Sequence, residues 1–236
     1  GDGIGLNPDE TTIAGALKDV GYSTKIIGKW HVGDQEEFLP TNHGFDSYFG
    51  LPYSNDMGRQ VDDPTLDDHD RKEHLRKRPP LPLIRDEEVI QEQPDLRALT
   101  ERYAEEAVKF IRGNKENPFF LYFAHMYVHL PLYAPETLVN ASENGDYGAC
   151  VAGVDWVAKV LFDELKRQGL DDNTLVIFTS DNGSRLDNQG GSNGELRGKK
   201  GTTWEGGQRV PCIMRWPGKI PAGGVRNELV SSIDFF

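Results

Sequence analysis

The sequence predicts an α/β fold in which a mainly parallel sheet carries helices on both faces. Helical segments alternate with short apolar strands along the chain, which is the order typical of parallel sheets. The longest apolar run, residues 119–124, has the composition of a buried strand. With 236 residues the chain is large enough for one domain with a substantial core.

The first helix is predicted to begin at residues 7–10, where Asn-Pro-Asp-Glu offers a capping side chain, a proline at the first helical position and an acidic residue in the first turn. Apolar residues then recur at helical spacing up to Val20. Gly21 ends this pattern, and residues 22–27 follow as a short strand.

Two further helix–strand units are predicted, and each helix ends near a glycine. The second unit has a helix over residues 96–111 and a strand over residues 119–124. The third has a helix over residues 147–168 and a strand over residues 175–180. The last strand is apolar enough to be central in the sheet.

Residues 56–95 are polar, rich in proline and charge, and without sustained periodicity. They are predicted to form a long surface excursion or lid within one partial domain that spans residues 1–236. A metal site is conceivable there, but a charged tract of this kind is far more often a solvated face. We assign no chemistry to its acidic and histidine side chains, which are Asp67, Asp68, His69, Asp70 and His74.

The composition limits the classes of partner. A formal net charge of −12 argues against binding of nucleic-acid backbones, which needs a basic face. No apolar run has the length of a transmembrane helix, and Cys150 and Cys212 lack the spacing of a metal or redox motif. The chain opens without an initiator methionine and stops where a new element starts, so we expect a fragment truncated at both ends.

Three polar motifs stand in loops that follow predicted strands. They are Gly-Lys-Trp-His at residues 28–31, Asp-Asn-Gly at residues 181–183, and a basic loop at residues 197–207. In an open α/β sheet such loops converge on one crevice, where ligands bind. Cations, an imidazole, a carboxylate and an amide at one crevice suit an anionic ester beside a hard metal ion such as Ca²⁺.

Residues 21–31 resemble the second signature of the sulfatase family, a long and specific motif. In that family the lysine and histidine of this motif, here Lys29 and His31, contact the nucleophile. The His-Leu-Pro step at His129 resembles the family's sulfate-contacting histidine, and an imidazole there can bind the ester oxygen and protonate a leaving alkoxide. The resemblance selects His129 over His125, for which no role is expected.

The resemblance extends to the two later motifs. Asp181 and Asn182 match the sulfatase pair that holds calcium, and residues 196–207 resemble the loop whose lysine grips the sulfate. Aligned on the Gly-Thr-Thr that follows, this role falls on Lys200, with Lys199 as an ambiguous neighbour.

Residues 50–56 look like the loop that borders the substrate in arylsulfatase-type members, which implies substrate contacts for Ser54, Asn55 and Asp56. The resemblance further implies the alkaline-phosphatase-like fold, hydrolysis of sulfate esters and Ca²⁺ as cofactor. The implied partners are a sulfated small molecule or glycan and the maturation enzyme that generates formylglycine. The implied location is extracytoplasmic, whether periplasmic, secreted or lysosomal.

The sulfatase nucleophile is a formylglycine made from Cys or Ser in a Cys/Ser-x-Pro-x-Arg motif. Neither Cys150 nor Cys212 lies in such a motif. The family's first pair of calcium-binding aspartates is also missing, because Gly1-Asp2-Gly3 has no strand before it. Both parts normally lie upstream of this segment, so we expect a sulfatase in the parent protein and an inactive segment on its own.

Two other functions stay open at this point. A phosphomonoester or phosphonate hydrolase of the related alkaline-phosphatase-like fold would reuse the Asp and His positions with other metals, commonly zinc. A catalytically dead paralogue would capture sulfated glycans without turnover. The motif at residues 28–31 and the lone Asp-Asn pair favour sulfate. A Gly-x-Ser-x-Gly match at residues 190–194 and a Gly-Lys match at residues 198–199 lack the flanking elements of a nucleophile elbow and a P-loop.

Overall fold

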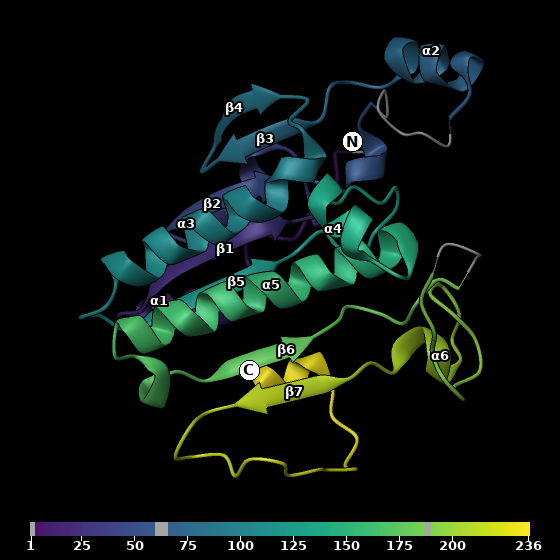
Figure 1. Cartoon of the computed structure of the whole chain (residues 1–236). Coiled ribbons are helices and arrows are strands. Elements are labelled where there is room, and N and C mark those ends of the chain that lie inside the picture. The colour runs from purple at the N-terminus through teal and green to yellow at the C-terminus, as the bar shows by residue number, and fades with distance from the viewer. Residues whose placement is uncertain (1–2, 60–65, 187–189) are drawn as a thin grey trace.

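A five-stranded mixed sheet forms the centre of the computed structural model, which describes residues 3–59, 66–186 and 190–236 (Figure 1). The strand order is β4-β3-β2-β1-β5. β1 pairs in parallel with β2 and β5, whereas β3 and β4 extend the sheet as antiparallel strands. The strands span Ser23–Lys29 (β1), Ser47–Leu51 (β2), Pro82–Arg85 (β3), Glu88–Glu92 (β4) and Phe119–Ala124 (β5).

Helices cover both faces of this sheet, as the sequence predicts. α3 and α5 pack together over one face, and α1 packs against β1 on the other (Figure 1). Within the described ranges, no helix combines the length and apolar character needed to cross a bilayer. The helices span Ile13–Asp19 (α1), Asp68–Lys77 (α2), Leu99–Gly113 (α3), Glu136–Ala141 (α4), Gly145–Arg167 (α5) and Glu205–Gln208 (α6).

Adjacent residues of β1 serve two different apolar cores. Ile27 points to the α3 face, in a core that includes Leu99. Ile26 points to the opposite face, in a core that includes Ala14 of α1. Successive side chains of a strand point to opposite faces, so a strand that is apolar at both positions must be covered on both. The prediction of a sheet with helices on both faces is therefore confirmed for β1.

α1 begins later than the sequence predicts. Its N-cap is Thr12, whose Oγ1 accepts a hydrogen bond from the Gly15 amide at 2.9 Å. The Asn7 side chain, the predicted cap, instead accepts from the Asp9 amide at 3.1 Å in a turn outside the helix. The predicted end is right, because Gly21 has a φ of 90° directly after the helix.

The strand β6 (Val176–Thr179) lies outside the main sheet, so the prediction that it is central is wrong. It pairs antiparallel with β7 (Cys212–Arg215) in a two-stranded sheet. Ile177 and Phe178, on its two faces, are 39% and 47% exposed. The apolar run does form a strand, but within the described ranges β7 is the strand that it pairs with, and both faces stay open.

Residues 56–95 contain regular elements that the sequence does not predict. The first part holds α2, in which no residue is buried. The second part forms β3 and β4, and both Leu81 and Leu83 are fully buried there. This apolar run is short and is flanked by prolines and charged residues, so it shows no periodicity from which a strand could be predicted. Residues 60–65 of the predicted excursion lie outside the described ranges, as do Gly1 and Asp2.

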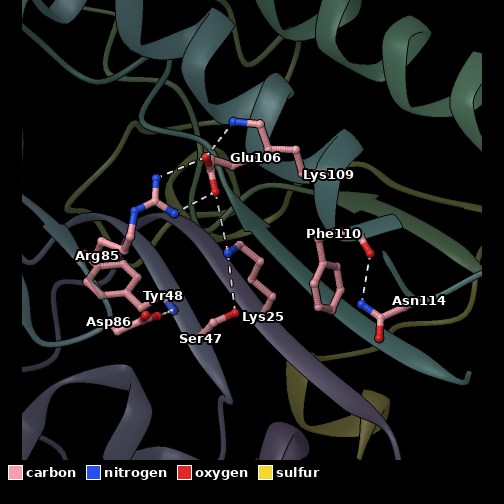
Figure 2. Close-up of polar contacts among 9 residues, drawn as sticks. All are labelled: Lys25, Ser47, Tyr48, Arg85, Asp86, Glu106, Lys109, Phe110 and Asn114. Carbon is pink, nitrogen blue, oxygen red and sulfur yellow. Dashed lines mark hydrogen bonds and ion pairs between the residues drawn. The ribbon is translucent and has the colours of Figure 1, made fainter. Parts of the chain in front are cut away.

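A cluster of charged side chains fastens α3 to the sheet (Figure 2). Glu106 of α3 accepts hydrogen bonds from the Arg85 guanidinium at 3.0 and 3.1 Å and from Lys109 Nζ at 3.2 Å. Lys25 Nζ lies 3.8 Å from Glu106 Oε2. Burial alone would raise the pKa of the Glu106 carboxyl, but the hydrogen bonds and charges of these cations lower it to about 2.

Candidate active site

The carboxyl ends of three neighbouring strands bring most of the predicted site residues to one edge of the main sheet. Lys29 is the last residue of β1, and His31 follows it by two positions. Ser54 lies in the loop after β2, and His129 lies in the loop after β5. Because β1 pairs in parallel with both β2 and β5, these loops leave the sheet at the same edge.

The three strands approach closely at this edge because small residues meet there. Gly28 of β1 pairs with Gly50 of β2 on one side and with Ala124 of β5 on the other. A Cβ on Gly28 would lie 1.9 Å from the Ala124 carbonyl oxygen, and a Cβ on Gly50 would lie 1.8 Å from the Gly28 oxygen. Gly28 also has a φ of 113°, which favours glycine. The position of Lys29, the next residue, therefore depends on a glycine here.

Backbone hydrogen bonds hold the Lys-Trp-His segment against the end of β2. The amides of Trp30 and His31 donate to the carbonyl oxygens of Leu51 and Pro52, both at 3.0 Å. Trp30 Nε1 donates to the Phe38 oxygen at 2.7 Å. His31 has a φ of 63°, a conformation that is uncommon for a residue with a side chain and recurs at functional sites.

His129 contacts the loop after β2. Its Nδ1 lies 2.7 Å from the Leu130 carbonyl oxygen and 3.3 Å from Ser54 Oγ. Nearby, Asn55 Nδ2 donates to the Pro131 oxygen at 3.3 Å. A carbonyl oxygen only accepts hydrogen bonds, so Nδ1 carries a proton and Nε2 is the nitrogen left for a ligand.

Asp181 and Asn182 stand together directly after β6. Asn182 Nδ2 donates to Asp181 Oδ2 at 2.6 Å, and Ser180 Oγ donates to the Asn182 carbonyl oxygen at 3.0 Å. The turn packs on the loop that carries the basic motif, because the Gly183 amide donates to the Gly207 oxygen at 3.1 Å. These contacts place the predicted metal pair beside the predicted sulfate-binding loop.

Hydrogen bonds that link the basic loop to the preceding segment fix the backbone of Lys200. Its amide donates to the Ser184 oxygen at 3.0 Å. The Asn193 side chain donates to the same oxygen at 3.2 Å. One residue earlier, the Lys199 carbonyl oxygen accepts from the Thr202 amide at 3.0 Å and from Thr202 Oγ1 at 2.7 Å, which closes a tight turn.

The charges at the end of β1, in the loops after β2 and β6, and in the basic loop affect one another. Burial lowers the pKa of Lys29, the charge of Asp181 raises it, the charge of Lys200 lowers it and the charge of Asp56 raises it. These four groups come from four separate segments of the chain. They therefore share one electrostatic environment, in which the charge of Lys200 acts on Lys29.

The two site histidines have lowered pKa values for the same reasons. Burial is the largest cause for His31, and the charges of Lys29 and Lys200 lower its pKa further while Asp56 raises it. Burial is also the largest cause for His129, whose backbone hydrogen bond raises the pKa and whose neighbours Lys200 and Lys29 lower it. An anion that enters this environment would be attracted and would raise both pKa values.

The donor set at the end of β6 fits a hard divalent cation. Asp181 offers a carboxylate and Asn182 an amide carbonyl, which are the oxygen ligands that Ca²⁺ prefers. The two side chains already face each other, as their hydrogen bond shows. They supply only part of the six or more oxygens that Ca²⁺ takes.

A different cluster, Asp67, His69 and Asp70, brings three donor atoms within 4.8 Å of one another, but all three residues are exposed. Asp67 accepts from the Asp70 amide at 2.8 Å as the N-cap of α2, which explains its presence without a metal.

His125 is a residue for which the sequence predicts no role. Its Nδ1 accepts a hydrogen bond from the Tyr127 amide at 3.0 Å, inside the loop that carries His129. Its position four residues before His129 is the signal that could have drawn attention to it.

Comparison with known proteins shows the family of the chain. A family model described as Sulfatase matches residues 2–236. The N-acetylgalactosamine-6-sulfatase of Canis lupus familiaris is 39% identical over 98% of this chain and 44% of its own length. Arylsulfatase G of Mus musculus is 34% identical over 98% of this chain and 49% of its own length. The chain thus spans about half the length of the curated relatives it matches.

Solved structures lead to the same family. The PsFucS1 sulfatase from Pseudoalteromonas sp. superposes with a TM-score of 0.86 at 34% identity, over 97% of this chain and 50% of that one. Ps i-CgsB, solved in complex with k-i-k-neocarrahexaose, has a TM-score of 0.78 at 32% identity, over 94% of this chain and 51% of that one. The predicted α/β fold of the alkaline-phosphatase-like type is confirmed by these neighbours. On the family match over nearly its whole length, the chain belongs to the sulfatase family.

Proposed function

We propose that the whole protein from which this chain derives hydrolyses sulfate esters, with a sulfated sugar as substrate. The observation that carries the proposal is that Lys29, His31 and His129 lie at the carboxyl ends of two neighbouring strands, where the charges of Lys29 and Lys200 act on both histidines. In a chain with a net charge of −12, such a gathering of basic groups forms a local site for an anion. Membership of the sulfatase family supports sulfate as that anion.

Lys29 and His31 are proposed to orient the nucleophile. When present, formylglycine supplies the nucleophile as a hydrated aldehyde. In our proposal it is made from a Cys or Ser outside this chain, since Cys150 is buried in α5 and Cys212 lies in β7. Lys29 donates a hydrogen bond to a hydroxyl of that group. His31 is neutral above its lowered pKa, so its imidazole could accept a proton from a group bound beside it.

Asp181 and Asn182 are proposed as ligands of Ca²⁺, with the remaining oxygens supplied by another part of the protein. A bound Ca²⁺ supplies Lewis-acid polarisation of a sulfate oxygen. The adjacent positions of the two side chains directly after β6 support this assignment, because one turn then carries both candidate oxygen ligands.

Lys200 and His129 are proposed to hold the sulfate oxygens that remain. Lys200 presents a cation from a loop with a fixed backbone. His129 presents Nε2, since its Nδ1 faces the Leu130 oxygen, and in the charged form it protonates the leaving oxygen. Fixed donors and cations aimed at charge that develops in the transition state contribute ~3 kcal/mol each.

A sulfated sugar as substrate is supported by two relatives. One is named for a sulfated amino sugar, and another was solved in complex with a neocarrahexaose. Ser54, Asn55 and Asp56 are proposed to border the sugar, because they follow β2 at the same edge as the sulfate-binding groups. We further propose an extracytoplasmic location and a formylglycine-generating or equivalent maturation enzyme as partner.

The test is an assay of the whole protein, produced in a host that makes formylglycine. Matched 4-nitrophenyl sulfate and 4-nitrophenyl phosphate should differ in kcat/KM by about a hundredfold or more in favour of sulfate. Preference for phosphate would overturn the proposal in favour of a phosphomonoesterase. Tight binding of sulfated sugars with no turnover of either ester would overturn it in favour of a binding protein. Residues 1–236 alone should show no turnover in the same assay.

A further inference from the structure

Three separate hydrogen bonds shape the backbone between the end of β5 and His129, and His125 takes part in two of them. Its amide donates to the Phe123 oxygen at 3.1 Å, and its Nδ1 accepts from the Tyr127 amide at 3.0 Å. The His129 amide in turn donates to the Met126 oxygen at 3.0 Å. The side chain of His125 therefore closes a turn over residues 125–127, which overlaps the turn over residues 126–129 that carries His129.

Aromatic side chains surround the His125 ring. The ring centroid lies 4.6 Å from that of Tyr127, 5.8 Å from that of Phe123 and 6.1 Å from that of Tyr103 in α3. Burial lowers the pKa of His125 to about 4, so the ring is neutral at ordinary pH. A neutral imidazole that accepts at Nδ1 carries its proton on Nε2.

The Nε2 atom of His125 is buried and has no hydrogen-bond partner in the described part of the chain. An aromatic hydrocarbon would fill the same space without this cost, since a buried polar atom without a partner is unfavourable. A histidine at this position is therefore explained by what its other nitrogen does, which is to hold the Tyr127 amide.

We propose that His125 is a positioning residue for His129. By accepting from the Tyr127 amide, it fixes the turn in which His129 Nδ1 faces the Leu130 oxygen and Ser54 Oγ. The turn in this form leaves Nε2 of His129 as the ring nitrogen that is available to a ligand. The catalytic consequence rests on the function proposed above, whereas the structural consequence does not.

Two substitutions separate the hydrogen bond from the packing. His125→Phe keeps an aromatic ring but removes the acceptor. His125→Asn removes the ring but keeps a side-chain oxygen, which can accept from the amide two residues later as in an Asx turn. If His125 acts through its acceptor, the Asn variant preserves the state of His129 and the Phe variant does not.

The first readout is the tautomer of His129, measured on the whole protein by ¹⁵N NMR of labelled histidines. We expect the Nδ1–H tautomer in the unsubstituted protein and in His125→Asn, and a mixture of tautomers in His125→Phe. The second readout is kcat with a sulfate ester. It should fall by roughly tenfold to a hundredfold in His125→Phe, with KM changed less, because misplaced catalytic groups cost rate.

An unchanged His129 tautomer in a folded His125→Phe would overturn the proposal, as would equal loss of the tautomer in both variants. If His125→Phe does not fold, the test rests on His125→Asn. The proposal requires that His129 keep its Nδ1–H tautomer in this variant, and loss of that tautomer would overturn it. If the whole protein turns over no sulfate ester, the function proposed above has failed. The NMR comparison then still confirms or overturns the positioning of His129.

Discussion

His129 Nδ1 lies 2.7 Å from the carbonyl oxygen of Leu130, so this nitrogen keeps its proton in both charge states of the ring. Nε2 therefore donates a proton only when the imidazole is charged. Burial and the charges of Lys200 and Lys29 hold the pKa of His129 below its ordinary 6.5. A bound anion raises that pKa again, which couples substrate binding to proton uptake at His129.

His129→Gln should affect esters according to their leaving groups. A sugar alkoxide needs a proton, and loss of a general acid costs about 10²–10⁴ in kcat. Nitrophenolate leaves without one, so the loss with 4-nitrophenyl sulfate should be no more than about tenfold. With the sugar sulfate, kcat of the unsubstituted enzyme should fall as pH rises through the pKa of bound His129, and this limb should vanish in the variant. Equal losses for the two esters at every pH would exclude His129 as the acid.

Lys200→Ala should lower kcat rather than raise KM. It removes a cation that faces oxygens whose charge grows in the transition state, and removal of one such group costs roughly a hundredfold or more. Lys199→Ala is the matched control and should cost less than about tenfold, because the resemblance aligns Lys200, and not Lys199, with the lysine that grips the sulfate. Steady-state kinetics on an aryl sulfate measure both. If Lys199→Ala is the more damaging change, the sulfate-binding role belongs to Lys199.

Asp181→Ala should weaken Ca²⁺ binding by the whole protein by at least about tenfold, since it removes a charged oxygen ligand from the shell. Asp70→Ala, in the exposed cluster at the start of α2, should leave the affinity unchanged. Titration calorimetry with Ca²⁺ alone makes the comparison without an activity assay. Residues 1–236 by themselves should bind Ca²⁺ weakly, because they hold part of the shell. Tight binding that survives Asp181→Ala would place the metal elsewhere.

Glu106→Gln should destabilise the fold at neutral pH by roughly 3 kcal/mol, because it leaves the buried Lys25 without its counter-ion. The folded pKa of Glu106, about 2, is below the ordinary 4.5. The stabilisation is therefore present above about pH 4.5 and is lost as pH falls toward 2. Urea unfolding at several pH values should show the two proteins converging in acid.

Lys109→Ala is the control for this cluster. The Lys109 side chain is 66% exposed, so its ion pair with Glu106 should contribute less than about 1 kcal/mol. If the free energies of unfolding of Glu106→Gln and the unsubstituted protein differ by the same amount down to pH 2, the charge of Glu106 is not the cause of the stabilisation.

Much of the fold follows from local sequence signals. Residues 119–124 form β5 with the predicted bounds, and Gly21 ends α1 as its position predicts. The start of α1 was misplaced because Asn7 and Thr12 both have capping side chains, and the choice between them depends on the chain that each contacts. The residue type identifies a possible N-cap, but it does not decide which of two possible N-caps begins the helix.

Long-range pairing was harder to predict. The apolar character of β6 indicates a strand but not its neighbour, and it pairs with β7 instead of joining the main sheet. In the site, the family resemblance predicts roles for Lys29, His129 and Lys200, and the charges of the two lysines act on His129 in the structure. The sequence predicts no role for His125, because its contact with the Tyr127 amide corresponds to no sequence motif.

The most direct test of the account is a crystal structure of the whole protein with sulfate bound. We predict one sulfate at the carboxyl ends of β1 and β5, with Lys200 Nζ and His129 Nε2 at about 2.7–3.2 Å from its oxygens and Lys29 on the same side of the sheet. A sulfate bound without Lys200 and His129, or Lys29 and Lys200 on opposite faces of the sheet, would contradict the account.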